Sequence, residues 1–383
     1  MASICFRRKR VSLFPCFILY YLTSFCFLKI NIFMSMTRKN SRRSFIQKTS
    51  LAASFSVFHP SYNFGHLRQN NRNIGHGDFK FNIDNNWGIQ DPNTYPVDHC
   101  HEMVLDLNNR ILLTTTHPKN NVLIYDRSGK ILDSWDLNCP GAHGLTAVNQ
   151  GGEEFFFITD PDSNKLCKTN SKGEKLLELS YPKEVKAYTS SSLFKPTETA
   201  VAENGDFYVA DGYGLDYIIQ YDHEGNYIRH FGGHGDGDDL FDCCHGVTID
   251  NRGNSTPTLL ITSRSKNEFK RFTLDGKWIE TVQMPGCYIC RPVIKGEYLL
   301  FAVIVTKDWG AYDGMLAVLN KNNKVVSFPG GSAPSYVDKT LIKPKYDQVS
   351  FRNPHDICVD DDWNLYVPQW NSGKTYPVKL TRI

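Results

Sequence analysis

Three histidines occupy the same point of a recurring segment in this 383-residue chain. They are His143 in AHGLTAV, His245 in CHGVTID and His355 in PHDICVD, and the last two each stand five residues before an aspartate. Neutral imidazoles that converge from separate repeats are favoured ligands of Zn²⁺. The pattern therefore predicts a zinc site, and three protein ligands would leave the fourth position open for catalysis.

A fourth histidine has the same offset, because His101 stands five residues before Asp106, whereas another copy of the segment has Thr197 at this point. The spacing of about 100 residues between the three ligands equals two copies of a repeat of about 50 residues, a length typical of β-propeller blades. The first strand of each blade lines the central channel, so histidines from the second, fourth and sixth blades would converge on its axis. The alternative is that each imidazole only binds the backbone of a neighbouring blade.

Six copies of a strand-turn-strand pattern would position these histidines. In the clearest copy, residues 195–232, the alternating apolar residues stop at Glu203-Asn204-Gly205, and Asn-Gly favours the positive φ angles of a tight hairpin. The sequence thus predicts an all-β fold, a six-bladed β-propeller over residues 96–383 with four antiparallel strands per blade. The preceding linker, residues 66–95, contains a candidate ring-closing strand around Phe79 to Trp87.

Composition limits the function of these repeats. The net charge is only +3, and much of the basic excess lies in the first 50 residues, so a nucleic-acid partner is not expected. The cysteines of the repeats permit disulfides without specifying them. Cys287-x-x-Cys290 could be a redox pair or half of a metal site, or simply two buried thiols or a local bridge.

Two targeting segments precede the repeats. Residues 34–65 contain SRRSFIQK, the arrangement of a twin-arginine export signal; the alternative is a basic disordered tail. Residues 1–33 hold an apolar run, Leu13 to Leu28, which is either a signal anchor or part of an over-extended reading frame with the natural start at Met34 or Met36. We expect export by the twin-arginine machinery to the periplasm or the cell exterior, with membrane attachment only if the first segment is retained.

The repeats resemble the NHL-type six-bladed propellers, and among them the peptidyl-α-hydroxyglycine α-amidating lyases. The resemblance covers most of residues 95–383 and rests on KPTETAVAENGDFYVADGYG with Tyr213, the HGL and HGV segments, LLITSRSKN with Arg264, and NPHDICVD with Asp356. It implies that the three histidines bind zinc, that Tyr213 acts as a base or orients a hydroxyl, and that Arg264 holds the substrate carboxylate.

Each of these roles has a plainer alternative. Tyr213 and Arg264 follow a second strand, where either side chain could merely cap the blade. Asp356 could orient a ligand histidine or join the proton path, or it could be a turn residue. The chain also departs from the lyases: His117 and Lys119 stand where they have an arginine. A further two differences are Gly214 in place of a cysteine and Asn353 in place of a methionine.

Three functions therefore remain open. The chain is an exported zinc-dependent lyase or hydrolase that acts on a small carboxylate-bearing or peptide-like substrate, or a non-catalytic NHL propeller that binds a protein or peptide. The third is a calcium-dependent lactonase-like propeller, but its acidic ligand positions are occupied by histidine. The segment Phe231 to Asp239, rich in Gly and Asp, could bind a structural calcium ion or serve as an interblade loop.

Overall fold

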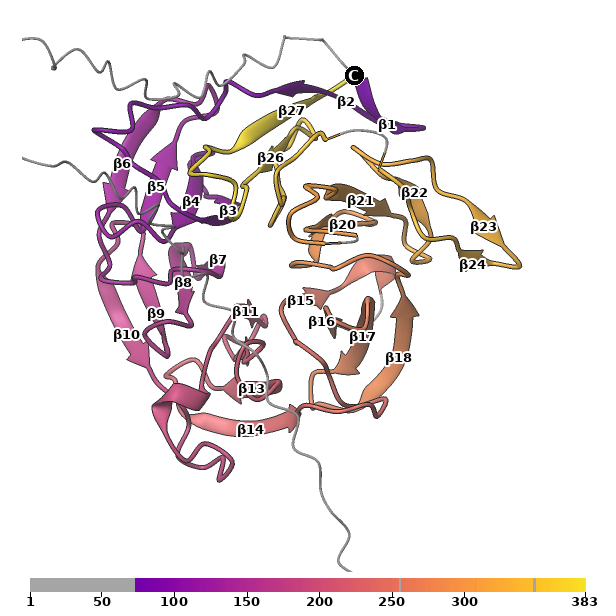
Figure 1. The fold of residues 1–383 in the computed structure, drawn as a ribbon. Coiled ribbons are helices and arrows are strands. Elements are labelled where there is room, and N and C mark those ends of the chain that lie inside the picture. The colour runs from indigo at the N-terminus through magenta and orange to yellow at the C-terminus, as the bar shows by residue number, and fades with distance from the viewer. Residues whose placement is uncertain (1–72, 255, 307, 347–348) are drawn as a thin grey trace, which may run out of the picture. The chain divides into compact units, whose positions relative to one another are not determined.

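Short apolar strands joined by tight turns form every blade of the ring in Figure 1. This computed structural model describes residues 73–254, 256–306, 308–346 and 349–383. The predicted leader (1–33), the twin-arginine segment (34–65) and the start of the linker lie outside the described residues. The predicted all-β, six-bladed β-propeller is confirmed, with four antiparallel strands in each blade.

The first three blades follow one another in chain order, and each begins with its innermost strand. The first blade contains β3 (Cys100–Leu105), β4 (Ile111–Thr115), β5 (Val122–Tyr125) and β6 (Ile131–Trp135). The second contains β7 (Leu145–Gln150), β8 (Glu153–Asp160), β9 (Lys165–Asn170) and β10 (Lys175–Leu179). The third contains β11 (Glu198–Val201), β12 (Phe207–Ala210), β13 (Tyr217–Tyr221) and β14 (Tyr227–Gly232).

The fourth and fifth blades repeat this order. The fourth contains β15 (Val247–Asp250), β16 (Thr258–Ser263), β17 (Glu268–Thr273) and β18 (Trp278–Gln283). The fifth contains β19 (Val293–Lys295), β20 (Tyr298–Val303), β21 (Met315–Leu319) and β22 (Val325–Ser327), followed by a small hairpin of β23 (Tyr336–Val337) and β24 (Thr340–Leu341).

The sixth blade joins the two ends of the described chain. It combines β25 (Cys358–Val359), β26 (Leu365–Val367) and β27 (Val378–Arg382) with β2 (Phe79–Asp84), which pairs antiparallel with β27. β1 (Asn73–His76) extends this sheet by pairing with β2, and the His76 N–H donates to Ser327 Oγ of the fifth blade at 2.9 Å. The ring is therefore closed by an N-terminal strand rather than by C-terminal strands alone.

Local sequence explains the hairpins, with one correction. At residues 203–205 only Gly205 has a positive φ, 89°, and the bonds Gly205 N–H to Ala202 O and Ala202 N–H to Asp206 O close a three-residue loop. This is a turn followed by a glycine bulge, so the prediction of positive φ at both Asn204 and Gly205 was wrong. The bulge tolerates an ordinary backbone at Asn204 because Gly205 alone takes the left-handed conformation.

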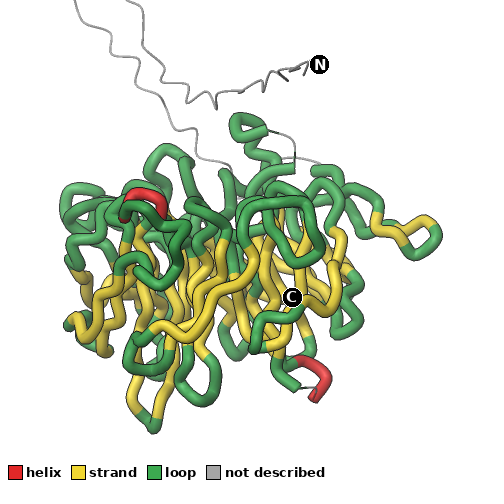
Figure 2. The backbone as a smooth tube through the Cα atoms, turned by 90° about the horizontal axis from the view of Figure 1, so that it is seen from below, coloured by secondary structure: helices red, strands yellow, loops and turns green. Residues whose placement is uncertain are grey.

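The six innermost strands (β3, β7, β11, β15, β19 and β25) lie side by side around the channel, and apolar side chains fill the spaces between blades. The loops gather at the two ends of this strand layer, as the side view in Figure 2 shows. The described chain has only two helical turns, η1 (Ser191–Leu193) and η2 (Arg252–Asn254), and neither has the length or apolar character of a membrane span. The rigid strand layer thus places loop residues from every blade at one channel mouth.

Candidate metal centre and active site

Four imidazoles meet on the channel axis, just before the innermost strands of four blades or at their start. The ring centroids of His101 and His143 are 4.4 Å apart, those of His143 and His245 4.8 Å, and those of His245 and His355 5.0 Å. All four side chains are buried. The structure therefore brings together the three predicted ligands and the fourth candidate, His101.

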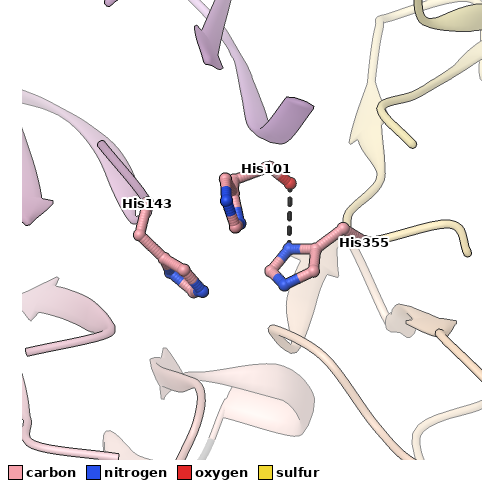
Figure 3. A group of neighbouring side chains, drawn as sticks. All are labelled: His101, His143 and His355. Carbon is pink, nitrogen blue, oxygen red and sulfur yellow. Dashed lines mark hydrogen bonds between the residues drawn. The ribbon is translucent and has the colours of Figure 1, made fainter. Parts of the chain in front are cut away.

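The closest set differs in one member from the predicted trio. Ligand atoms of His101, His143 and His355 lie within 4.8 Å of one another, and Figure 3 shows these rings turned toward a common space. His245 lies beside this set, with its Nε2 3.2 Å from Nε2 of His143. Within the described ranges, this is the one cluster of three or more potential metal-ligating side chains.

Backbone carbonyls orient two of the rings. Nδ1 of His143 lies 2.9 Å from Thr197 O, and Nδ1 of His355 lies 3.0 Å from His101 O (Figure 3). A carbonyl oxygen only accepts, so each Nδ1 must carry the proton and each Nε2 must keep its lone pair. A ligand histidine is commonly held in this way by a bond from its second nitrogen.

The protonation state of the rings also suits a cation. Burial lowers the pKa of His143 to about 3. Burial, together with the neighbouring imidazoles and Arg264, lowers the pKa of His101, His245 and His355 well below 6.5. The neutral imidazole is the ligand form. Among the described residues, Nδ1 of His101 and of His245 has no hydrogen-bond partner, so both atoms remain free for a ligand or a water. The cluster therefore fits a metal ion.

Two predicted site residues reach this cluster from neighbouring loops. Tyr213 follows β12, and its hydroxyl lies 3.0 Å from Nε2 of His245 and 3.3 Å from Nε2 of His143. Arg264 follows β16, and its Nη1 donates to the Tyr213 hydroxyl at 3.2 Å. Two other donors of Arg264 bind Ile289 O and Cys290 Sγ, so in the described part of the chain two of its five N–H groups have no partner and can bind a ligand.

The hydroxyl of Tyr213 keeps its proton at neutral pH in this arrangement. Burial raises the pKa of Tyr213 to about 12, although the adjacent Arg264 guanidinium opposes that rise. The residue as a whole is 41% exposed, because one side of the ring faces solvent while the hydroxyl points toward the imidazoles. Tyr213 can therefore donate a hydrogen bond within the cluster, and its use as a base requires additional positive charge nearby.

Asp356 lies in a different group, which the sequence interpretation did not anticipate. Its carboxylate accepts hydrogen bonds from Arg291 Nη2 at 2.6 Å, Arg291 Nε at 3.1 Å and the Met103 N–H at 2.9 Å. Arg291 also approaches Oε2 of Glu102 at 3.3 Å and Oε2 of Glu198 at 3.6 Å. Asp356 thus belongs to a buried axial cluster around Arg291, which we call the Arg291 cluster.

The repeat explains both groups. Cys290 takes the histidine position of the fifth blade, since its N–H donates to Ala302 O as that of His143 donates to Thr159 O. The six residues at this position are His101, His143, Thr197, His245, Cys290 and His355. The six residues that follow them are Glu102, Gly144, Glu198, Gly246, Arg291 and Asp356. Four of these, Glu102, Glu198, Arg291 and Asp356, form the Arg291 cluster, so its signal lay one residue after the shared repeat position.

Close approach between blades explains the glycines that follow two of the histidines. A Cβ at Gly144 would lie 2.5 Å from Thr197 O, the carbonyl that orients His143. A Cβ at Gly246 would lie 2.8 Å from Cα of Arg291. In the HGL and HGV segments, the histidine thus places an imidazole on the channel axis. The glycine after it has no side chain, so the backbone of the neighbouring blade can approach closely.

A cavity of about 550 Å³ opens over the imidazoles. Part of its wall is formed by two of the imidazoles, His101 and His143, together with Tyr213 and Arg264. The other lining residues are His99, Thr116, Gly141, Pro161, Asp162, Lys195, Cys243, Ser265, Tyr288, Trp309 and Trp370. Its size suits a small organic molecule. The aromatic residues of this wall were not singled out in the sequence, because the loops that carry them have no shared motif.

Two other predicted features, the Cys287-x-x-Cys290 pair and the Gly- and Asp-rich segment, lie in ordinary structural environments. Cys287 and Cys290 are buried free thiols, and burial raises their pKa to about 12 and about 11. The segment from Phe231 to Asp239 begins in β14 and continues into the loop toward β15, where Lys270 Nζ donates to Gly237 O at 2.7 Å. The Lys270 ammonium group therefore binds a carbonyl oxygen of this interblade loop that a calcium ion would otherwise use as a ligand.

The residues that differ from those of the amidating lyases have defined contacts in the structure. His117 accepts a hydrogen bond at Nδ1 from the Lys119 N–H, 3.2 Å away in the loop after β4, and Lys119 Nζ donates to Thr94 O. Neither residue lines the cavity over the imidazoles. Asn353 is fully buried, and within the described part of the chain its side-chain amide has no hydrogen-bond partner.

Fold and site together define a β-propeller with a histidine-lined, pocket-forming channel. No family model matches the chain. Over 106 residues it is 33% identical to a probable peptidyl-alpha-hydroxyglycine alpha-amidating lyase of Caenorhabditis elegans, across 27% of this chain and 29% of the relative. Over 193 residues it is 25% identical to NHL repeat-containing protein 3 of Homo sapiens, across 47% of this chain and 54% of the relative. The chain thus spans about half or less of these relatives' lengths.

Solved structures share the fold at low identity. A streptogramin B lyase has a TM-score of 0.51 and 16% identity, and covers 79% of this chain and 97% of its own. A gluconolactonase from Xanthomonas campestris has a TM-score of 0.53 and 11% identity, with coverages of 80% and 91%. The sequence relatives confirm the predicted resemblance to the amidating lyases and NHL-repeat proteins, and the structural neighbours support the propeller fold.

Proposed function

We propose that this chain is a zinc-dependent lyase that cleaves a carbon–nitrogen bond in a small carboxylate-bearing or peptide-like substrate. A partial relative is named a probable peptidyl-alpha-hydroxyglycine alpha-amidating lyase, which supports the lyase part of this proposal. The observation that carries the proposal is the Tyr213 hydroxyl, which lies within hydrogen-bonding distance of two imidazole Nε2 atoms and of the Arg264 guanidinium. If Tyr213 merely capped its blade, its hydroxyl would not need these three partners at the channel axis.

The imidazoles would hold the metal through His143 and His355, whose Nε2 atoms are free of protons, together with His245 and His101. When bound, zinc would supply positive charge that polarises a substrate hydroxyl and favours the Tyr213 phenolate. The fit rests on the neutral state of the buried rings and on the carbonyl-oriented tautomers of His143 and His355.

The chemistry assigned to the side chains is a proton transfer with bond cleavage. Tyr213 takes the proton of the hydroxyl on the carbon next to the substrate carboxylate. That carbon then forms a carbonyl as its bond to nitrogen breaks, and the nitrogen leaves as an amide after gaining the proton from Tyr213, which returns to its phenolate form. The two N–H groups of Arg264 that have no partner among the described residues hold the carboxylate, which leaves in glyoxylate. We further propose that the protein acts outside the cytoplasm after twin-arginine export.

Metal content tests the first half of the proposal. The purified full-length protein should contain about one equivalent of zinc by elemental mass spectrometry. His143→Ala should lose it, because His143 is close to both His101 and His245. The matched control His230→Ala removes a histidine from the outer strand β14 and should leave the zinc content unchanged. A protein without zinc, or a His143→Ala variant that keeps it, would show that the cluster is structural.

Glyoxylate release from α-hydroxyhippurate tests the second half. Tyr213→Phe removes only the hydroxyl, so it should retain zinc and lower kcat/KM by about 100-fold or more, the usual contribution of a general acid or base. Zinc binding without glyoxylate release by the unaltered protein would reject the lyase. Such a result would favour the alternative, a non-catalytic NHL propeller that binds a protein or peptide.

A further inference from the structure

Aromatic rings form one wall of the cavity over the imidazoles. Trp309 and Trp370 have ring centroids 5.6 Å apart, and Tyr288 lies 6.4 Å from Trp309. His99 continues the series, 5.7 Å from Trp370 and 6.4 Å from His101. Edge-to-face and tilted contacts of this kind hold rings in fixed positions. The series, which we call the aromatic wall, therefore runs without interruption from solvent to the candidate metal centre.

The aromatic wall is accessible, although its members are large apolar groups. Trp309 is 47% exposed, and Tyr288, Trp370 and His99 are each partly exposed. A tryptophan so exposed on a monomer surface contributes little to folding, whereas one that lines a concave site can bind a ligand. All four rings line the same cavity as Tyr213 and Arg264.

Cations also line this cavity. Arg264 and Lys195 line it, and Asp162 is the one acidic residue among the described lining residues. Lys195 is positioned by its backbone, which donates to Asp211 Oδ1, and its Nζ donates to Pro161 O at 3.4 Å. The cavity lining thus combines the aromatic wall, two cations, two of the imidazoles and Tyr213.

The strand order explains why distant segments meet here. Arg264 lies in the loop after β16, Trp309 in the loop after β20 and Trp370 in the loop after β26. These are second-to-third-strand loops of three consecutive blades, so they emerge at the same end of the channel. Lys195 and Tyr288 come from segments that lead into the innermost strands of the third and fifth blades. The aromatic and basic residues therefore come from successive blades and share one rim.

We propose that the substrate carries an aromatic or large planar apolar group on the acyl side of the bond that is cleaved, and that the aromatic wall binds this group while Arg264 and Lys195 hold the carboxylate. The inference rests on the proposed function for the identity of that bond. An N-acylated α-hydroxyglycine with an aromatic acyl group has its carboxylate at one end and its ring at the other. These two groups match the two kinds of lining in the cavity, the cations and the aromatic wall, with the reacting carbon near Tyr213.

Two stable probes separate the contribution of the ring from that of the carboxylate. N-benzoylglycine and N-acetylglycine share the amide and the carboxylate, and only the first has a ring. Neither carries the hydroxyl needed for reaction, so binding to the full-length protein can be measured by titration calorimetry with and without zinc. We expect N-benzoylglycine to bind about tenfold more tightly, in line with the contribution of a stacked aromatic pair and its buried area.

Three variants assign that preference. Trp309→Ala should weaken N-benzoylglycine binding about tenfold and leave N-acetylglycine binding unchanged. The matched control Trp278→Ala removes a tryptophan of similar exposure, 39%, from the outer strand β18 and should change neither affinity. Lys195→Met should weaken both probes equally, because both carry the carboxylate.

The outcomes distinguish this inference from the proposed function. Equal affinity of the unaltered protein for the two probes, or an equal loss of both in Trp309→Ala, would overturn the aromatic wall as a binding surface. Glyoxylate release could still be observed in that case, and only the substrate class would change. Conversely, a ring preference lost in Trp309→Ala, without zinc or glyoxylate release, would keep the binding surface and reject the lyase.

Discussion

Replacing Arg291 with methionine tests the buried charges on the channel axis. The guanidinium donates to Leu145 O at 2.7 Å, to Met103 O at 3.1 Å and to Asp356 Oδ2 at 2.6 Å, and it links the first, second, fifth and sixth blades. Methionine retains much of the aliphatic volume but no charge or donor. Removing one partner of a buried ion pair costs about 3–5 kcal/mol, so we expect Arg291→Met to lower the free energy of unfolding by about that amount.

The loss should depend on pH. Burial raises the pKa of Glu102, Glu198 and Asp356, and the charge of Arg291 limits each of these rises. A carboxyl group whose pKa is raised by folding destabilises the fold as pH increases through that pKa. Without Arg291 the three pKa values rise further, so protons neutralise the buried carboxylates more completely at pH 5 than at pH 8. The destabilisation relative to the unaltered protein should therefore be larger at pH 8 than at pH 5.

Urea unfolding followed by tryptophan fluorescence at both pH values measures this effect. Lys277→Met serves as the control, because Lys277 is an exposed lysine in an ion pair with Asp275 and its loss should leave unfolding unchanged within error. An Arg291→Met variant as stable as the unaltered protein, or one with the same deficit at pH 5 and pH 8, would refute the account of the Arg291 cluster.

Two further predictions concern the imidazoles and the buried ion pairs of Asp250. Gly144→Ala places a Cβ against Thr197 O, so it should misalign His143 and weaken zinc binding about tenfold in a chelator competition; unchanged affinity would mean that this carbonyl does not orient the ring. Burial would raise the pKa of Asp250, but hydrogen bonds from Arg252 and Arg271 lower it to about 2. Its ionised form therefore stabilises the fold above its unfolded pKa near 3.8, by at most about 2 kcal/mol, and this contribution disappears as pH falls through 2. Thermal unfolding of Asp250→Asn should show a deficit at pH 6 that narrows toward pH 3, and a constant deficit would contradict the assigned pKa.

Local sequence was sufficient to predict the blades. Strand alternation and hairpin turns act over a few residues, so each four-stranded unit could be recognised before any contact between blades was known. A shared repeat position also placed His143, His245 and His355 on equivalent strands, and the same count reached His101. In a repeat protein, equivalent sequence positions occupy equivalent sites around the axis, so this part of the site could be predicted from the sequence.

Only the tertiary structure decided which side chains meet. Asp356 was expected beside a ligand histidine, but the fold directs it to Arg291, because adjacent strand residues point in different directions. The aromatic wall was invisible in the sequence, since Tyr288, Trp309 and Trp370 lie in irregular loops whose separation depends on the angle between blades. Repeat position thus determines that a side chain reaches the channel, whereas ring closure and loop conformation determine its partners there.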